Sequence, residues 1–295
     1  MPMPSWSVPT ELFPVEHRFI ELGGARLHYV DEGSGEPLLL LHGNPTWSFL
    51  YRKIIAGLRD DFRCIAVDYP GYGMSDAPPG YTFTPAEHSA VVERFVDELG
   101  LTGLTLMVQD WGGPIGLGLA SRRPELVARL IIGNTFAWPN RELRVRVFSA
   151  VLGGPPGRAL TRWFNFAPRV FFRRGFAQPV SPDVMRAYLA PWQDPARRPA
   201  AAIAPRQLVA AAPYLTKLEA ALPTIAGKPS LIVWGQRDFA FREAERMRFE
   251  KLFPGHRTVL LPNASHFLQE DAGDQIAAEI MQFAGPPASQ DLPDA

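Results

Sequence analysis

The chain has 295 residues, of which 46% are hydrophobic, so it can bury a substantial core in one large α/β domain or two small ones. Its 30 Lys and Arg residues balance its 30 Asp and Glu residues, which gives no reason to expect binding to nucleic acid or to an acidic membrane. A small neutral partner is more consistent with this charge.

Cys64 is the only cysteine and lies in an apolar run, so an intramolecular disulfide is excluded and a buried, reduced thiol is expected. The first residues contain no basic segment followed by an apolar stretch, and no run of about 18 apolar residues occurs in the chain. We therefore expect a cytoplasmic protein that does not span a membrane.

The first predicted elements are two strands within residues 18–30, where alternating side chains around Gly23-Gly24 indicate an antiparallel hairpin. Short apolar runs follow along the chain, separated at first by helix-length segments such as Pro85 to Leu99. Uninterrupted runs of this kind are typical of parallel strands that are covered on both faces. The remaining six predicted strands are 37–41, 64–67, 104–108, 130–132, 231–234 and 258–261.

Residues 136–215 interrupt this pattern, because they contain no comparable strand, many Pro and aromatic residues, and helix-like pieces such as 141–152. We interpret this segment as a helical cap domain inserted after the sixth strand, with residues 1–135 and 216–295 forming the main domain. The cap has an excess of nine positive charges, which indicates either a solvated surface or one that contacts subunits or anions. The residues after Gly285 are expected to form a frayed tail.

Asp110 occupies a sharp turn between the predicted strand 104–108 and a helix that begins near Gly112. A nucleophilic Ser sits on such a strained turn in the G-x-S-x-G motif, and here Asp holds the Ser position. Val108 replaces the first Gly of that motif, and no Ser elsewhere in the chain has this context. Asp110 is thus a candidate nucleophile, although an Asp at this place could also simply cap the helix.

Asp238 and His266 follow the predicted strands 231–234 and 258–261, so the chain order is nucleophile, acid, base. Of the six histidines, only His266 has the position that a base requires. Taken singly, Asp238 would be read as a turn residue and His266 as a loop residue. The order of all three favours a catalytic triad.

Asn44 follows the predicted strand 37–41 in the segment His42-Gly43-Asn44, where its backbone N–H is placed to serve as an oxyanion donor together with that of Trp111. The Asn44 amide and the Trp111 indole are also neutral side-chain donors, which suit a weakly basic anionic leaving group. The alternatives are that the Asn44 side chain hydrogen-bonds to backbone groups of its own loop and that the Trp111 side chain packs in the core.

Four segments make the chain resemble a haloalkane dehalogenase of the α/β-hydrolase superfamily, with matches spread over about 14–135 and 222–284. The resemblance implies a mostly parallel eight-stranded sheet, Asp110 as nucleophile, His266 as base, and a halide site formed by Trp111 and a second donor. It implies no cofactor and no metal. The segments are His42 to Arg52, Asp68 to Asp76, Gln109 to Pro114 and His266 to Asp271.

Members of this family place the carboxylate that pairs with the His base after the sixth or the seventh strand. The sixth predicted strand is followed by Gly133-Asn134-Thr135, which offers no acid, so Asp238 is expected to fill this role. With Asn44 as the second halide donor, the chain resembles the subgroup that combines these two choices. Other members take that donor from a cap Trp, so contributions from Trp138, Trp163 and Trp192 stay open.

The expected reaction converts a small halogenated alkane and water into an alcohol, a halide ion and a proton, through an alkyl ester on Asp110. An epoxide hydrolase would use the same ester but needs acids for the ring oxygen, commonly two cap tyrosines, for which Tyr188 and Tyr214 are available. A third reading is a binding protein without turnover. Candidates for lining the pocket, or for packing in the core, are Phe136, Phe148, Phe164, Phe171 and Phe172.

Overall fold

A computed structural model describes residues 6–285; the predicted tail lies outside this range. Eight strands form one sheet in the order β1-β2-β4-β3-β5-β6-β7-β8. Strands β1 and β2 form the predicted hairpin and β2 pairs antiparallel with β4, whereas all later neighbours are parallel. The strands are β1 Arg18–Leu22, β2 Ala25–Glu32, β3 Glu36–Leu41, β4 Phe62–Val67, β5 Leu104–Asp110, β6 Val127–Thr135, β7 Ser230–Gly235 and β8 His256–Leu261.

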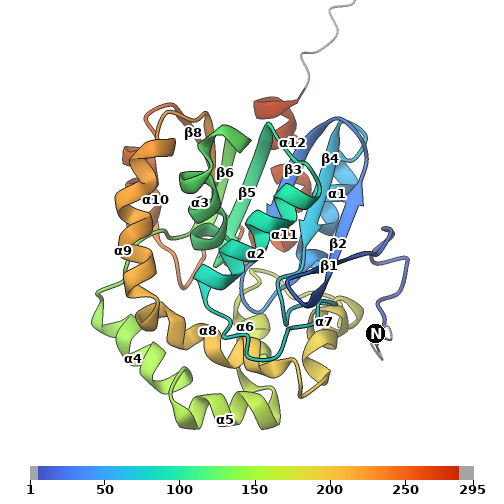
Figure 1. The fold of residues 1–295 in the computed structure, drawn as a ribbon, viewed down its shortest axis with the longest axis vertical. Coiled ribbons are helices and arrows are strands. Elements are labelled where there is room, and N and C mark those ends of the chain that lie inside the picture. Colours follow the sequence, from blue (N-terminus) through green and yellow to red (C-terminus); the bar gives the residue numbers. More distant parts are fainter. Residues whose placement is uncertain (1–5, 286–295) are drawn as a thin grey trace, which may run out of the picture.

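Helices cover both faces of this sheet, as the uninterrupted apolar strands predict. Figure 1 shows α2 and α3 over one face and α1 and α12 over the other. Every residue of β5, at the centre, is buried. The helices that follow β3, β4, β5, β7 and β8, together with α9 before β7, are α1 Arg52–Leu58, α2 Pro85–Glu98, α3 Gly112–Arg122, α9 Ala212–Ala221, α10 Glu243–Leu252, α11 Leu268–Asp271 and α12 Gly273–Ala284.

The predicted helix at 85–99 illustrates why these segments fold as they do. Thr84 accepts a hydrogen bond from the Glu87 backbone N–H, the Glu87 side chain accepts from the Thr84 N–H, and Pro85 opens the helix. This capping box satisfies backbone donors that the first turn leaves free. The prediction is confirmed, with α2 ending at Glu98.

The segment between β6 and β7 is helical, as expected, and gathers in Figure 1 at one end of the sheet. Its first helix begins at Leu143, two residues later than the predicted 141–152. Residue 215, the predicted end of the cap, lies inside α9. The helices before α9 are α4 Leu143–Leu152, α5 Pro155–Phe164, α6 Phe166–Arg174, α7 Pro182–Leu189 and α8 Arg198–Ala210.

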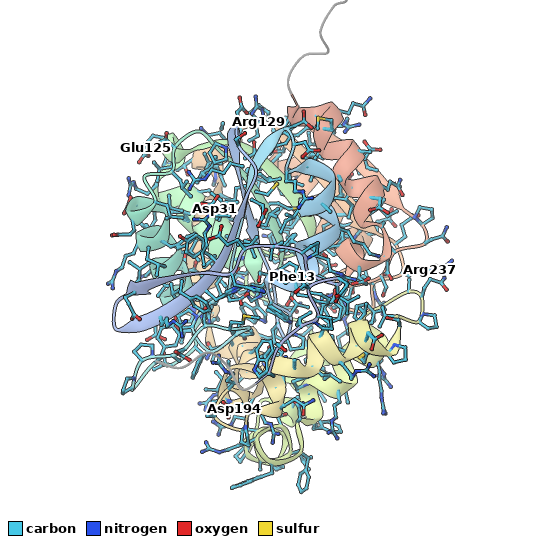
Figure 2. The ribbon with its side chains drawn as sticks, turned by 90° about the vertical axis from the view of Figure 1, so that its right-hand side faces the viewer. Phe13, Asp31, Glu125, Arg129, Asp194 and Arg237 are labelled. Carbon is cyan, nitrogen blue, oxygen red and sulfur yellow. The ribbon has the colours of Figure 1, made fainter. Side chains whose placement is uncertain are left out.

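The helical segment lies at the end of the sheet where the parallel strands finish. In Figure 2, Asp194 of this segment lies at the far end of the molecule from Glu125 and Arg129, which flank the start of β6. Loops that leave the carboxyl ends of β3, β5, β7 and β8 therefore meet beneath these helices, where ligands bind in open α/β sheets. None of the helices within residues 6–285 is long and apolar enough to cross a membrane.

Candidate active site

Asp110 lies on a strained turn at the end of β5. Its φ is +48°, a left-handed conformation that costs free energy for a residue with a Cβ. The Thr135 hydroxyl donates to the Asp110 carbonyl at 2.5 Å, and Gly112 begins α3 where a Cβ would come within 2.2 Å of the Leu41 carbonyl oxygen. The turn thus holds the Asp110 side chain out from the sheet, as the predicted elbow requires.

Two backbone N–H groups donate to the Asp110 carboxylate. The Asn44 N–H donates to Asp110 Oδ2 at 2.8 Å, and the N–H of Trp111 also donates to this carboxylate. Burial raises the pKa of Asp110, while the His266 charge and these two N–H groups lower it, and the net pKa lies above the ordinary value of 3.8. The predicted pair of backbone donors is therefore assembled around Asp110.

His266 and Asp238 are also brought together. His266 Nδ1 lies 3.0 Å from Asp238 Oδ2, and the Ala240 N–H donates to Asp238 Oδ1 at 2.7 Å. Burial lowers the pKa of His266, but the charge and hydrogen bond of Asp238 and the charge of Asp110 together raise it above 6.5. The second ring nitrogen, Nε2, has no partner among residues 6–285 and belongs to a side chain that lines the same cavity as Asp110.

Sequence reasoning missed the part that Asn134 plays here. Its side-chain amide donates to Asp238 Oδ2 and to the Gly235 carbonyl, both at 2.9 Å, while its own oxygen accepts from the Gly235 N–H at 2.7 Å. The sequence indicated only that no acid follows β6. The available signal was a polar side chain just after the apolar run 130–132 of β6, next to β7, the strand that Asp238 follows.

A cavity of about 320 Å³ connects these groups. Asn44, Asp110, Trp111 and His266 lie in its wall, and most of the rest of the wall is apolar. Of the five candidate phenylalanines, Phe136, Phe148 and Phe171 line it, whereas Phe164 is exposed and Phe172 is buried elsewhere. The cavity has the size and character of a site for a small organic ligand.

Two side-chain donors point into this cavity without an acceptor. The Asn44 amide nitrogen and the Trp111 indole N–H have no hydrogen-bond partner among residues 6–285, and both side chains line the cavity. By contrast, the Trp192 indole donates to the Pro45 carbonyl at 2.9 Å. Trp138, Trp163 and Trp192 do not line this cavity.

The two tyrosines on which an epoxide hydrolase would depend lie outside the cavity. The Tyr188 hydroxyl donates to Glu270 at 2.6 Å, and that of Tyr214 donates to the Pro114 carbonyl at 2.7 Å. No tyrosine of the described chain is part of the cavity wall. The wall offers no phenol to protonate a ring oxygen.

Comparisons with known proteins agree with this geometry. A family model for the α/β-hydrolase fold matches residues 36–273. Haloalkane dehalogenase 2 of Mycobacterium bovis is 44% identical over 277 residues, covering 93% of this chain and 97% of that protein. A cis-3-alkyl-4-alkyloxetan-2-one decarboxylase of Shewanella oneidensis is 33% identical over 290 residues, covering 92% and 89%.

Among solved structures, the haloalkane dehalogenase DatA of Agrobacterium tumefaciens superposes with a TM-score of 0.82 at 28% identity, covering 90% of this chain and 94% of that one. The fold predicted from the sequence is thereby confirmed. Sequence similarity over nearly the whole length and the agreement in fold lead to one conclusion: the chain belongs to the haloalkane dehalogenase family of the α/β-hydrolase fold.

Proposed function

We propose that the protein hydrolyses small halogenated alkanes to an alcohol, a halide ion and a proton, with Asp110 as the nucleophile. The observation that carries this proposal is the convergence of one carboxylate, one imidazole and two free N–H donors on a single apolar cavity. The 44% identical relative supports the same reaction.

In the first step, an oxygen of Asp110 attacks the sp³ carbon that bears the halogen. A C–O bond forms as the C–halogen bond breaks, and the halogen leaves with the bonding electrons. The Asn44 amide and the Trp111 indole donate hydrogen bonds to the departing halide. These bonds take the place of the hydrogen bonds that the halide would receive from water, which the apolar wall excludes. The product of this step is an alkyl ester on Asp110.

In the second step, His266 Nε2 removes a proton from a water molecule, and the resulting hydroxide attacks the carbonyl carbon of the ester. Asp110 Oδ2 already accepts from the Asn44 N–H at 2.8 Å, so the negative charge on the tetrahedral intermediate develops in a site that is prepared for it. When the intermediate collapses, the bond between the carbonyl carbon and the alkyl oxygen breaks, and the alkoxide takes the proton that His266 removed from water. The carboxyl group of Asp110 then loses its own proton to solvent, which restores the carboxylate and accounts for the proton among the products. Asp238 orients His266 and stabilises its protonated form.

Ester formation also prepares the base electrostatically. The negative charge of Asp110 is one of the causes that raise the pKa of His266, and esterification removes that charge. His266 is therefore more readily neutral in the alkyl-enzyme than in the free enzyme. The base becomes available in the step that needs it.

The proposal is tested by halide release from brominated and chlorinated alkanes of different lengths. Wild type and Asp60→Ala, which changes an exposed turn residue, are expected to release halide at equal rates, and Asp110→Ala to release none. Halide release that survives in Asp110→Ala, or its absence in the wild type for every alkane, would overturn the proposal.

A second candidate function has an observation of its own. Arg144 and Arg242 lie in the cavity wall, and Arg144 also pairs with Glu142. A haloalkane has no charge for a guanidinium to pair with. Ring opening of an oxetan-2-one by Asp110 would create a carboxylate as the leaving group, and loss of carbon dioxide from it would give an alkene and restore Asp110. The name of the Shewanella oneidensis relative describes a reaction of this class.

One experiment distinguishes the two candidate functions. It measures alkene formation from a cis-3,4-dialkyl-oxetan-2-one beside bromide release from a bromoalkane.

We also propose that residues 136–215 act as a cap domain that supplies the outer wall of the cavity. Val145, Phe148, Phe171 and Leu208 of this segment line the cavity opposite the catalytic loops. For location we propose the cytoplasm, because Cys64 is a buried free thiol of the kind that reducing compartments preserve.

A further inference from the structure

Asn44 has a neighbour that the proposed mechanism does not use. The hydroxyl of Tyr72 donates a hydrogen bond to Asn44 Oδ1 at 3.3 Å, and within residues 6–285 it has no other hydrogen-bond partner. Tyr72 comes from the loop after β4, and its side chain is only 4% exposed. This contact holds the oxygen end of the amide against Tyr72, a residue that does not line the cavity.

The orientation of this amide decides whether Asn44 helps or hinders halide departure. A side-chain amide has a donor end and an acceptor end that occupy nearly the same space. The NH₂ end stabilises a halide, whereas the carbonyl oxygen would repel it. A buried phenol that keeps its proton prefers the oxygen end as its acceptor, and burial raises the pKa of Tyr72, so the proton is retained.

The Tyr72 ring is held so that it cannot follow a rotated amide. It packs edge-on against Trp192, with ring centroids 5.5 Å apart, and against His42 at 5.4 Å. Trp192 is itself anchored by its hydrogen bond to the Pro45 carbonyl. The side chains of Trp192, from the segment between β6 and β7, and of His42, from the loop after β3, therefore fix the phenol.

The backbone of the Tyr72 loop is fixed from beneath by Asp68. Asp68 Oδ2 accepts from the Met74 N–H at 2.9 Å and lies 2.8 Å from His28 Nδ1, with both of these side chains fully buried. Gly73 makes this approach possible, because a Cβ there would come within 1.9 Å of Asp68 Oδ2. The position of the hydroxyl is thus set by a rigid, buried network.

We infer that Tyr72 is a positioning residue, which holds the Asn44 side chain with its NH₂ group toward the departing halide. This inference rests on the proposed dehalogenation. Tyr72 does not touch the substrate cavity itself and acts through Asn44.

Asn44 has two tasks, one in each chemical step, and Tyr72 supports only the first. The Asn44 side chain acts on the halide in the first step, and its backbone N–H acts on the oxyanion in the second. Loss of the Tyr72 hydroxyl should therefore weaken halide binding and slow alkylation while ester hydrolysis keeps its rate. Because one neutral hydrogen bond contributes about 0.5–1.5 kcal/mol, we expect about a two- to tenfold effect.

The test compares Tyr72→Phe with Tyr69→Phe. Tyr69 is a matched control, since it lies in the same loop, is equally buried, and its hydroxyl has no partner within the described chain. Bromide affinity is measured by titration of tryptophan fluorescence, and alkylation and ester hydrolysis by rapid-quench single turnover with a bromoalkane. Only Tyr72→Phe should bind bromide more weakly and alkylate more slowly, with unchanged ester hydrolysis.

Both changes are then repeated in Asn44→Ala, where Tyr72→Phe should cause no further loss. Equal behaviour of the two phenylalanine variants, a parallel loss in both chemical steps, or an additive loss in Asn44→Ala would overturn the inference while leaving the proposed function intact. A wild type that neither binds bromide nor releases it from any alkane would overturn both.

Discussion

The side-chain amide of Asn134 donates to Asp238 Oδ2, the same oxygen that lies 3.0 Å from His266 Nδ1. Asn134 stands at the end of β6, the position at which some family members carry the acid itself. Here an amide at that place supports an acid that comes from the next strand in the sheet. We expect Asn134→Ala to slow ester hydrolysis by about tenfold or more, because a hydrogen bond to a charged group contributes about 1.5–3 kcal/mol.

Rapid-quench kinetics would show this loss, with Asn263→Ala, in the exposed turn before His266, as the control. Alkylation should be unchanged, since it does not use His266. An equal loss in both steps would mean that Asn134 acts on the fold rather than on the base.

His266→Asn should alkylate and then stop. Asp110 does not need a base in order to attack carbon, but no group remains to activate water. Intact-mass measurement after addition of a bromoalkane should show a gain equal to one alkyl group for each chain, in stoichiometric yield. His256→Asn, which changes a half-buried histidine far from the cavity, should show no such gain. An unmodified His266→Asn mass beside an active wild type would exclude this role.

The two chemical steps should differ in their dependence on pH. His266 must be neutral to act as a base, and its pKa in the free enzyme is raised above 6.5. In the alkyl-enzyme the Asp110 charge is gone and Asp238 remains, so the pKa of His266 is lower than in the free enzyme. Ester hydrolysis should therefore fall as the pH drops through the pKa of His266 in the alkyl-enzyme. Alkylation requires only ionised Asp110, whose pKa is raised from a starting value of 3.8, and should persist to lower pH. The check is to quench wild-type turnover with acid at a series of pH values and to measure by mass how much alkyl ester has accumulated. More ester is expected at lower pH. The same pH dependence for alkylation and for ester hydrolysis would contradict the prediction.

Gly43→Ala should abolish activity. A Cβ at this position would come within 2.4 Å of both Cβ and Oδ2 of Asp110, so the carboxylate could not stay against the Asn44 N–H. Gly227→Ala is the control, because no atom lies within 4 Å of the Cβ that it would add. Steady-state kinetics with a bromoalkane should show loss in the first variant alone. Retained activity in Gly43→Ala would mean that the close approach at Asp110 is not required.

The buried ion pair between Arg52 and Glu270 should contribute to stability and not to chemistry. Their side chains are 9% and 6% exposed, and Arg52 makes two hydrogen bonds to Glu270, at 2.6 and 2.7 Å. Glu270→Gln leaves a buried guanidinium without its partner, which costs about 3–5 kcal/mol. Tyr188→Phe removes the hydrogen bond that Tyr188 donates to Glu270 at 2.6 Å and the one that it accepts from Arg52 at 3.3 Å. Because both partners are charged, this change should cost about 1.5–3 kcal/mol. Urea unfolding measures both; equal costs would contradict this ranking.

Patterns within single elements predicted the sheet, because alternation and apolar runs directly reflect which faces of a strand are buried. The Gly23-Gly24 hairpin, the succession of strands along the chain and the turn at Asp110 all follow from local sequence. Contacts between distant segments do not. Whether Phe164 or Phe171 faces the cavity depends on how the cap helices pack, and the helical repeat leaves both options open.

The supporting residues of the site were missed for the same reason. Asn134 and Asp238 are 104 residues apart, and Tyr72 and Asn44 are 28 apart, so only the register of neighbouring strands and the shape of loops bring them together. The types and the chain order of Asp110, Asp238 and His266 were enough to predict that they meet, and the structure brings them together at one cavity. Their catalytic roles stay a prediction.

The origin of the oxygen in the product tests the covalent ester on Asp110 most directly. A single turnover of excess enzyme with a bromoalkane in ¹⁸O-labelled water should give an alcohol without label and place ¹⁸O in the peptide that contains Asp110, because water attacks the carbonyl carbon of the ester. Label in the alcohol, with an unlabelled Asp110 peptide, would show direct attack of water on the alkane and contradict the account.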